Sequence, residues 1–481
     1  MKSRIVRPVQ KYDQKGKKNK KAGARLDQTQ PLRPVGTSRT AAGRPSGETQ
    51  PMRTAEIRAG YAGYRRSVER RREIVQTPRS RAQSRPVKQK RAKRSWFGNL
   101  ISTKSMGAED YFDFDLLLVV IFLLGFGLVM LYSTSAYEAE VELGNDLYYF
   151  SRQALIGAVG FIIMIFISRI DYHIYGAFAA EIYAVAMVLM VLVKSPLGIT
   201  LNGARRWIRL PGNLTLQPAE ITKIAVILFI AYELCRLGRK AYKMEGVIQV
   251  FVFGAIASGG VLFLTDNLST AIIVMAITCI LIFVSHPKMK PFLIFIGVAA
   301  VIAVVGIAIL AVTAANSDNF RLQRIISWLN PEATADSGSY QVMQGLYAIG
   351  SGGFFGKGLG NSTQKLGVIP EAQNDMILVV ICEELGVFGA FVIFLLFGIL
   401  LYRLMFIAQN APDLYGSLIA TGIFAHIALQ VTLNIAVVTG MLPTTGITLP
   451  FISYGGTAIV FLLAVMGIAL GISRRIRLEG E

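Results

Sequence analysis

The sequence predicts an all-α polytopic membrane protein with about ten transmembrane helices. From Phe114 onward, apolar runs of about twenty residues follow one another, the length that an α-helix needs to cross roughly 30 Å of hydrocarbon. The charge lies elsewhere. Residues 1–100 hold 28 Lys and Arg against 6 Asp and Glu, a net charge of +22, whereas the rest holds 22 against 24, a net charge of −2. With 53% hydrophobic residues, the chain is neither a soluble enzyme nor a secreted disulfide scaffold.

Ten apolar runs define the predicted spans. They cover about 116–135, 152–168, 173–193, 220–237, 247–264, 268–285, 291–314, 376–402, 416–440 and 449–472. An even number of spans places both termini on one side, and the basic tail together with Arg474, Arg475 and Arg477 identifies that side as the cytoplasm. We therefore expect a ten-helix domain over 114–473. A large outer loop at 315–375 separates helices 7 and 8, and 474–481 forms a short cytoplasmic C-terminus.

The tail, residues 1–113, is predicted to be disordered and cytoplasmic. It is rich in Lys, Arg, Gln, Gly, Pro and Ser and cannot bury enough apolar surface to offset the entropy of folding. No apolar stretch of signal-peptide length precedes Phe114. The tail could be attracted to anionic lipid or nucleic acid, or it could serve as a topology signal and partner tether. An organelle transit peptide is a weaker alternative, and we expect no nucleic-acid partner for the protein as a whole.

Two predicted outer loops depart from the positive-inside rule. The loop 194–219 carries Lys194, Arg205, Arg206 and Arg209, and the loop 315–375 carries Arg321, Arg324, Lys357 and Lys365. Cations on the translocated side work against the topology, so an anionic ligand outside the membrane is the simplest explanation. Arginine is suited to bidentate contacts with diphosphate oxygens. The alternative is that these cations simply face water.

Carboxylates at the membrane edge provide candidates for chemistry. Glu220 and Lys223 are three residues apart after Pro218, so on a helix they share a face, and we expect the pair to point inward, as an ion pair or as part of a site. Asp375 lies where the eighth span begins, where a carboxylate could also act as a helix cap. Glu383 and Glu384 lie elsewhere around that helix and are expected to be buried structural or tuning acids.

Other motifs exclude several chemistries. The three cysteines and three histidines show no metal-ligand spacing, so a His or Cys metal site is not expected. Glycine-rich segments at 350–353, 356–360 and 454–456 allow close backbone approach but do not match a nucleotide-binding phosphate loop. We expect no nucleotide and no haem.

Five motifs together closely resemble the SEDS family of bacterial shape, elongation, division and sporulation proteins. They are NGARRWI at 202–208, QPAEITK at 217–223, AIGSGG at 348–353 within the run from Tyr340 to Gly360, PEAQND at 370–375 and LPFISYGG at 449–456. The resemblance covers about 114–475, is most like the cell-division branch typified by FtsW, and does not include the tail. Ala219 stands where Ser is usual in the family, and Asn374 and Met376 replace the common Thr and Phe.

The resemblance implies a ten-helix peptidoglycan glycosyltransferase that polymerises lipid II outside the bacterial cytoplasmic membrane. It implies that Asp375 is essential and that Trp207, Glu220 and Lys223 surround the same cavity. It also implies a class B penicillin-binding protein as transpeptidase partner, together with other division proteins and a location at the septum.

Physical chemistry is compatible with this role. Glycosyl transfer from a lipid diphosphate needs a base, for which Asp375 is the candidate, and cations for the departing diphosphate. The predicted cation pool is Arg205, Arg206, Arg209, Lys223, Arg321, Arg324, Lys357 and Lys365. A divalent cation, Mg²⁺ or Mn²⁺, could share the diphosphate charge. A lipid II flippase and a noncatalytic division scaffold remain as alternatives.

Overall fold

The structure is a computed structural model that describes residues 111–476 apart from short gaps. The gaps are 202–203, 211–213, 288–296, 298–319, 333 and 335–338. Three predictions therefore lie largely or wholly outside the described residues: the disordered tail up to residue 110, the seventh span at 291–314, and the end of the C-terminus from Arg477.

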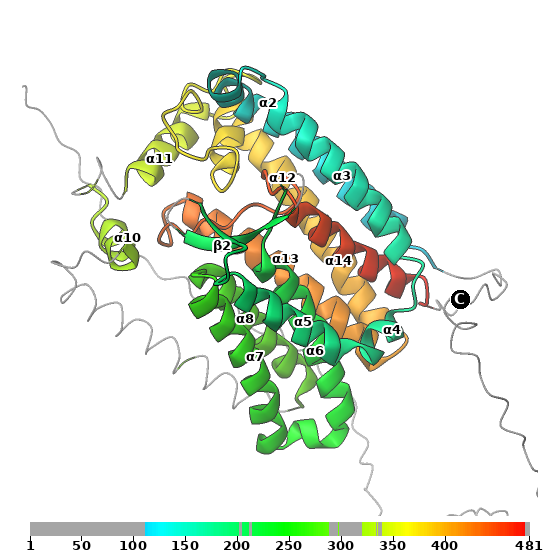
Figure 1. The fold of residues 1–481 in the computed structure, drawn as a ribbon. Coiled ribbons are helices and arrows are strands. Elements are labelled where there is room, and N and C mark those ends of the chain that lie inside the picture. Colours follow the sequence, from blue (N-terminus) through cyan, green and yellow to red (C-terminus); the bar gives the residue numbers. More distant parts are fainter. Residues whose placement is uncertain are drawn as a thin grey trace, which may run out of the picture. The chain divides into compact units, whose positions relative to one another are not determined.

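Helices dominate the described residues (Figure 1). They are α2 (Phe114–Leu143), α3 (Tyr148–Ile167), α4 (Tyr172–Ala177), α5 (Ala179–Leu192), α6 (Pro218–Leu237), the 3₁₀ helix η3 (Gly238–Tyr242), α7 (Met244–Leu264), α8 (Leu268–Ser285), α10 (Phe320–Leu329), α11 (Tyr340–Gly352), α12 (Ile377–Asn410), α13 (Leu414–Val438) and α14 (Ala458–Ser473). Six of them, α2, α3, α7, α8, α12 and α13, are long and apolar enough to cross a membrane, and α5 and α14 are shorter apolar helices. The predicted all-α polytopic membrane fold is confirmed.

Two predicted spans differ in detail from the observed helices. The third, predicted as one helix, is broken at Phe178 into α4 and α5. The tenth begins at Ala458 rather than at 449, because the preceding segment contains Pro450 and places Phe451 at a φ of 65°. At both places the sequence remains largely apolar, so hydropathy alone does not reveal that the helix is interrupted.

The helices α2 and α12 run antiparallel and are tied together near both ends. At one end, Arg403 pairs with the fully buried Asp113, with 2.9 Å between Nη2 and Oδ2. At the other end, the Ser133 hydroxyl donates to Glu384, with Oγ 2.7 Å from Oε2. A helical segment of twenty residues, the separation of the two contacts on α2, is about 30 Å long, the thickness of a bilayer's hydrocarbon core. We refer to the end that carries Glu384 and the start of α12 as the Asp375 end.

The helix α12 is kinked at Gly386, where a loop inserts its backbone. Gly386 has φ 67° and ψ −162°, and an added Cβ would lie 2.4 Å from the Phe354 carbonyl oxygen, so only glycine fits. The interrupted helix bonds are replaced from the loop. The Phe388 N–H donates to the Phe354 carbonyl, and the Lys357 and Gly358 N–H groups donate to carbonyls at 383 and 384. The segment after α11 is thereby fixed against α12.

The two predicted outer loops contain structure that hydropathy did not predict. The first forms a three-stranded antiparallel sheet of β1 (Gly198–Leu201), β2 (Ala204–Leu210) and β3 (Leu214–Leu216), in that order. The second contains α10 and α11. Figure 1 shows the sheet, α10 and α11 gathered at one end of the long helices, with the last turn of α14 at the opposite end. Short elements of this kind lack the long apolar runs from which the spans were predicted.

Candidate functional site

A ladder of polar side chains lies along one buried face of α13. His426, Gln430 and Asn434 are spaced four residues apart and are 2%, 4% and 1% exposed. The Gln430 amide Nε2 donates to the Thr448 carbonyl at 3.0 Å, and the Asn434 amide Nδ2 donates to the Ile447 carbonyl at 2.7 Å. His426 Nε2 lies 3.1 Å from Gln430 Oε1. The ladder therefore holds the segment that follows α13 against the helix bundle.

The first predicted pair, Glu220 and Lys223, joins this ladder. Both lie in the first turns of α6, which begins with Pro218, and Lys223 Nζ is 2.9 Å from Glu220 Oε1. The same Nζ donates to Gln430 Oε1 at 3.1 Å, and the lysine side chain is 2% exposed. The prediction that the pair shares a face and points inward is confirmed. A buried ammonium is stable here because a carboxylate and an amide both accept from it.

Asp375 lies just before α12 and is bound to the same ladder through its backbone. The Asn434 amide donates to the Asp375 carbonyl at 2.9 Å. The carboxylate itself is directed toward the segment after α13, since a Cβ added at Gly446 would lie 3.8 Å from Oδ2. The alternative that Asp375 caps α12 is wrong: the cap position is Met376, and no side chain caps that helix end.

The carboxylate of Asp375 has an unusual environment. Its Oδ1 is buried and has no hydrogen-bond partner among the described residues. The pKa of Asp375 is raised to about 6, chiefly by burial; the charge of Glu371 also acts to raise it, whereas the backbone N–H of Asp375 and the charge of Arg324 act to lower it. A carboxylate with a pKa near neutrality and an unpartnered oxygen is suited to accept a proton.

Arg324 is a predicted outer-loop cation whose charge acts on Asp375. It lies on α10, and its Nη1 donates to the Thr444 carbonyl at 3.2 Å. On the same helix, the Trp328 indole N–H donates to the Gly440 carbonyl at 2.9 Å. Both bonds fasten α10 to the segment after α13. The side chain of Arg321, a further predicted site residue on α10, lies outside the described residues.

The cations of the first loop are arranged by the small sheet. Arg205, Arg206, Trp207 and Arg209 all lie on β2, and the pairing of β2 with β1 shifts register between Arg205 and Trp207, which breaks the regular alternation of faces there. Arg205 Nη2 donates to the Ser195 carbonyl at 2.5 Å, and Arg206 Nη2 donates to the Asp266 carbonyl at 3.1 Å. These two guanidinium groups thus bind the protein's own backbone, whereas Arg209 is exposed. A role in substrate binding for these residues stays a prediction.

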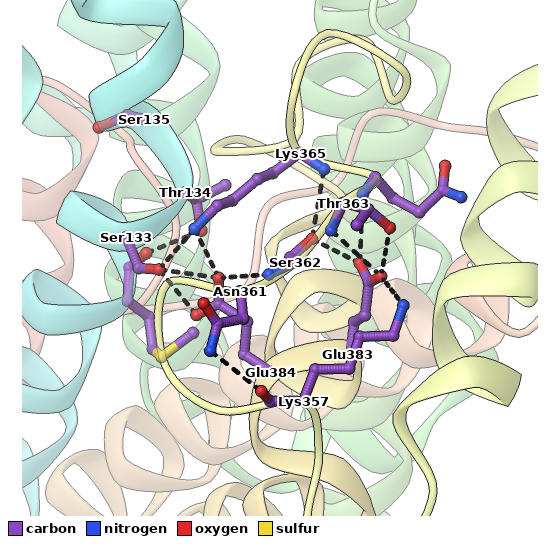
Figure 2. A network of polar contacts seen from close by, with 12 residues as sticks. Ser133, Thr134, Ser135, Lys357, Asn361, Ser362, Thr363, Lys365, Glu383 and Glu384 are labelled. Carbon is purple, nitrogen blue, oxygen red and sulfur yellow. Dashed lines mark hydrogen bonds and ion pairs between the residues drawn. The ribbon is translucent and has the colours of Figure 1, made fainter.

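Two other cations of the predicted pool are engaged elsewhere. Figure 2 shows Lys357 and Lys365 beside Glu383 and Glu384, with both glutamates fully buried. Lys357 Nζ lies 2.5 Å from Glu383 Oε1, and Lys365 Nζ lies 2.7 Å from Glu384 Oε1. The expectation that both acids are buried is confirmed. Each of these lysines has an internal carboxylate partner, as Lys223 has, and a contribution of either to a diphosphate site stays a prediction.

The predicted divalent cation has little support among the described side chains. In the parts of the chain that the structure describes, no group of three or more His, Cys, Asp or Glu side chains could hold a metal ion. Asp375 has one unpartnered oxygen and Glu371 as an acidic neighbour, so any cation there would need further ligands from a bound substrate or water.

Sequence reasoning missed the ladder on α13 and the role of Glu371. Gln430 and Asn434 are polar residues four apart inside a predicted span, and intramembrane polar groups normally face a protein interior. The four-residue spacing of these two amides is the sequence feature that indicates a polar face on this helix.

The fold and the site together define a class: a polytopic membrane protein with a buried, partly unpaired polar site at one end of its helix bundle. The family model of FtsW, RodA and SpoVE, described as "Cell cycle protein", matches residues 114–478. The chain belongs to this family, and the predicted resemblance is confirmed.

Individual relatives agree with this membership. Stage V sporulation protein E of Bacillus subtilis (strain 168) is 39% identical over 366 residues, 75% of this chain and 97% of the relative. A protein named "Probable peptidoglycan glycosyltransferase FtsW" from Trichlorobacter lovleyi is 39% identical over 368 residues, 76% of this chain and 94% of that relative. Division and sporulation proteins are therefore equally similar to the chain by this measure.

Solved structures show the same fold. A chain from a peptidoglycan synthase complex, studied for its coordination of polymerization and crosslinking, superposes with a TM-score of 0.64 at 25% identity, covering 77% of this chain and 99% of that one. The rod shape determining protein RodA of Thermus thermophilus superposes with a TM-score of 0.55 at 24% identity, covering 76% and 98%. The same helix bundle therefore occurs in both of these solved structures.

Proposed function

We propose that the chain is a peptidoglycan glycosyltransferase that polymerises lipid II into glycan strands during bacterial cell division, with Asp375 as the catalytic base. The observation that carries the proposal is the half-buried Asp375 carboxylate, whose Oδ1 is buried without a partner among the described residues and whose pKa is raised to about 6. Relatives at 35–39% identity that carry the name peptidoglycan glycosyltransferase support the reaction class.

In this reaction, Asp375 accepts the proton of an acceptor sugar hydroxyl as that oxygen forms a bond to the anomeric carbon of the donor. The bond from that carbon to the lipid diphosphate breaks, and the diphosphate leaves with the electron pair. Lys223, bonded to Gln430 of the ladder, and Arg324, bonded to the segment after α13, supply positive charge for the diphosphate. Asn434 fixes the backbone of Asp375 and so orients the base.

The divalent cation remains a proposal. Mg²⁺ or Mn²⁺ would neutralise part of the diphosphate charge, with Asp375 as the protein ligand nearest to it and substrate oxygens supplying the rest. Dependence of the polymerisation rate on added Mg²⁺ or Mn²⁺, measured after chelation, tests this independently of the base.

Orientation and partners follow from the same proposal. The Asp375 end faces the outside of the bacterial cytoplasmic membrane, both termini are cytoplasmic, and the protein acts at the division septum. A class B penicillin-binding protein crosslinks the strands as they emerge, with other division proteins present. The structural likeness to a chain of a peptidoglycan synthase complex supports the transpeptidase partner.

The test is polymerisation of purified lipid II by the full chain, alone and with its transpeptidase partner. Wild type should produce glycan strands, and Asp375→Asn should produce none while keeping its thermal unfolding midpoint. Full polymerisation by Asp375→Asn would exclude this residue as the base. An inactive wild type whose complex nevertheless supports septal growth without Asp375 would favour the noncatalytic scaffold.

The flippase alternative rests on one observation. The ladder from Asn434 to His426 spans eight residues of α13, about 12 Å of helix, so buried polar groups reach well inside the predicted span. A flippase needs a polar route across both leaflets. Translocation of labelled lipid II in vesicles, measured for wild type and for His426→Leu, would distinguish transport from polymerisation.

A further inference from the structure

A second polar cluster lies at the Asp375 end, where α2 ends, α3 begins and two later segments meet them. The Gln373 side chain interacts with the Glu138 carboxylate on α2. The Tyr454 N–H donates to the Gln373 carbonyl at 2.9 Å, and the Gln153 amide Nε2 lies 3.5 Å from the Ser453 carbonyl. The cluster joins α2, α3, the segment that carries Asp375, and the LPFISYGG motif.

Two buried amide oxygens in this cluster have no partner. Gln153 is 2% exposed and Gln373 is 3% exposed, and among the described residues neither Oε1 has a hydrogen-bond donor. Leaving such an oxygen unpaired costs about 1–3 kcal/mol, and native proteins rarely contain two together without a reason. Both oxygens accept hydrogen bonds, so they suit a ligand that presents hydroxyl or amide donors.

Aromatic rings line the same place. The Tyr149 ring lies edge-on to the Tyr454 ring, with centroids 5.1 Å apart at 79°, and to the Tyr148 ring, with centroids 5.4 Å apart at 84°. All three tyrosines are partly exposed. Tyr149 and Gln153 are four residues apart on α3 and therefore share a face. The Arg152 guanidinium donates to the Tyr148 hydroxyl at 3.0 Å.

We propose that Gln373, Gln153 and the tyrosines at 148, 149 and 454 form a saccharide-binding subsite for N-acetylated amino sugars. The tyrosine faces would pack on the apolar C–H surfaces of sugar rings, and the two amide oxygens would accept from sugar hydroxyl or acetamido N–H groups. Gln373 is two residues from Asp375, so a sugar held here lies along the chain segment that carries the base. The inference rests on the proposed function and names where its glycan binds.

The cluster differs from an ordinary packing contact in one respect. In the network around Glu383 and Glu384, the oxygens of both buried carboxylates have donors. Here the Gln153 amide N–H group is directed to a backbone carbonyl and Gln373 interacts with Glu138, while both amide oxygens stay without donors among the described residues. The open acceptors lie beside partly exposed tyrosines rather than within the apolar core.

The test measures saccharide binding directly, in the full chain carrying Asp375→Asn so that no turnover occurs. The probes are the soluble N-acetylglucosamine–N-acetylmuramic acid disaccharide and the corresponding tetrasaccharide. In this background, Gln373→Leu should weaken binding about tenfold, equivalent to about 1.4 kcal/mol, and Tyr149→Leu about fivefold. Tighter binding of the tetrasaccharide identifies the growing strand as the occupant, and equal binding identifies the disaccharide of lipid II.

Matched controls come from the same end of the molecule. Gln364 also has a buried, unpartnered Oε1, and Tyr347 on α11 is 58% exposed, but neither contacts the cluster through any described bond. Gln364→Leu and Tyr347→Leu should change the affinity less than twofold. Unchanged affinity in both Gln373→Leu and Tyr149→Leu, or an equal loss in the controls, overturns the subsite.

A second measurement covers the case in which Gln373→Leu fails to fold. A photoreactive phenylalanine analogue placed at position 149 should crosslink to a labelled glycan strand, and the same analogue at position 347 should not. Equal labelling at both positions contradicts the proposal. If wild type polymerised no lipid II while its saccharide affinity still depended on Gln373 and Tyr149, the proposed function would fail and the subsite would stand.

Discussion

Two groups of carboxylates lie within ten residues of each other around the start of α12, and they differ in how they are paired. Glu383 accepts from Lys357, Ser362 and Thr363, and Glu384 accepts from Lys365 and Ser133 (Figure 2). Asp375, by contrast, has a buried Oδ1 without a partner. The pairing of Glu383 and Glu384 is explained by their contribution to the stability of the fold, whereas the unpaired oxygen of Asp375 is explained by a role in the reaction.

The difference separates two uses of a buried acid. A carboxylate surrounded by donors is held ionised and contributes to the fold, because proton uptake would break several bonds. A carboxylate left short of donors has a raised pKa and exchanges protons easily. In this protein, the paired acids hold the loop that leads to Asp375, and the unpaired acid lies at the end of that loop.

The largest expected effect is on activity at Asp375. Asp375→Asn should lower the polymerisation rate by about 10²–10⁴-fold, because the amide cannot accept the proton. The unfolding midpoint at pH 7.5 should stay the same or rise, because the substitution removes a poorly solvated charge. Polymerisation kinetics and thermal unfolding of the same preparation check both parts. If Asp375→Asn lost stability along with activity, Asp375 would be a carboxylate that stabilises the fold, as Glu384 is.

The next effect is on stability at Glu384 and Lys365. Lys365→Met leaves the fully buried Glu384 without its cation, and breaking such a pair costs about 3–5 kcal/mol. Replacing both partners by apolar residues, in Lys365→Met with Glu384→Leu, should recover most of that loss. Denaturation of the single and double variants in detergent measures the coupling. Equal losses in both would show that loop packing, not charge, supports the network.

A smaller effect is expected from pH. Asp375 must be ionised to act as base, so the rate should rise with pH through about 6 and fall about tenfold per pH unit below it. Stability should respond in the opposite direction. Because the folded state binds this proton more tightly than a carboxyl with the usual pKa of 3.8, wild type should lose stability as pH rises from about 4 to about 6. The slope should be absent in Asp375→Asn, which serves as control.

The spans and the paired charges of α6 could be predicted from the sequence because both depend on local spacing. A run of twenty apolar residues forms a helix in a bilayer whatever its neighbours are, and residues three apart on a helix share a face. Glu220 and Lys223 therefore appeared where expected. Asp375 was found from its motif and its place at a helix start.

The pairing of the outer-loop lysines could not be predicted in the same way. Lys365 meets Glu384 because the loop after α11 is bonded to the backbone of α12 next to the Gly386 kink, and Ser133 joins them from a helix that lies 251 residues before Glu384 in sequence. The small sheet was missed for a related reason. Its strands at 198–216 are short, and their arginines suggested ligand binding when two of them bind backbone carbonyls.

The smallest expected effect distinguishes the two lysines of the paired group. Lys357 is 33% exposed, and removing it leaves Glu383 with donors from Ser362 and Thr363, so Lys357→Met should cost only about 1 kcal/mol. Lys365 is 7% exposed, and Glu384 retains fewer donors without it. Unfolding of both variants in parallel, at low and high salt, measures the difference. If Lys357→Met proved as costly as Lys365→Met, the number of remaining donors would not determine the stability of a buried carboxylate here, and the contrast with Asp375 would lose its physical basis.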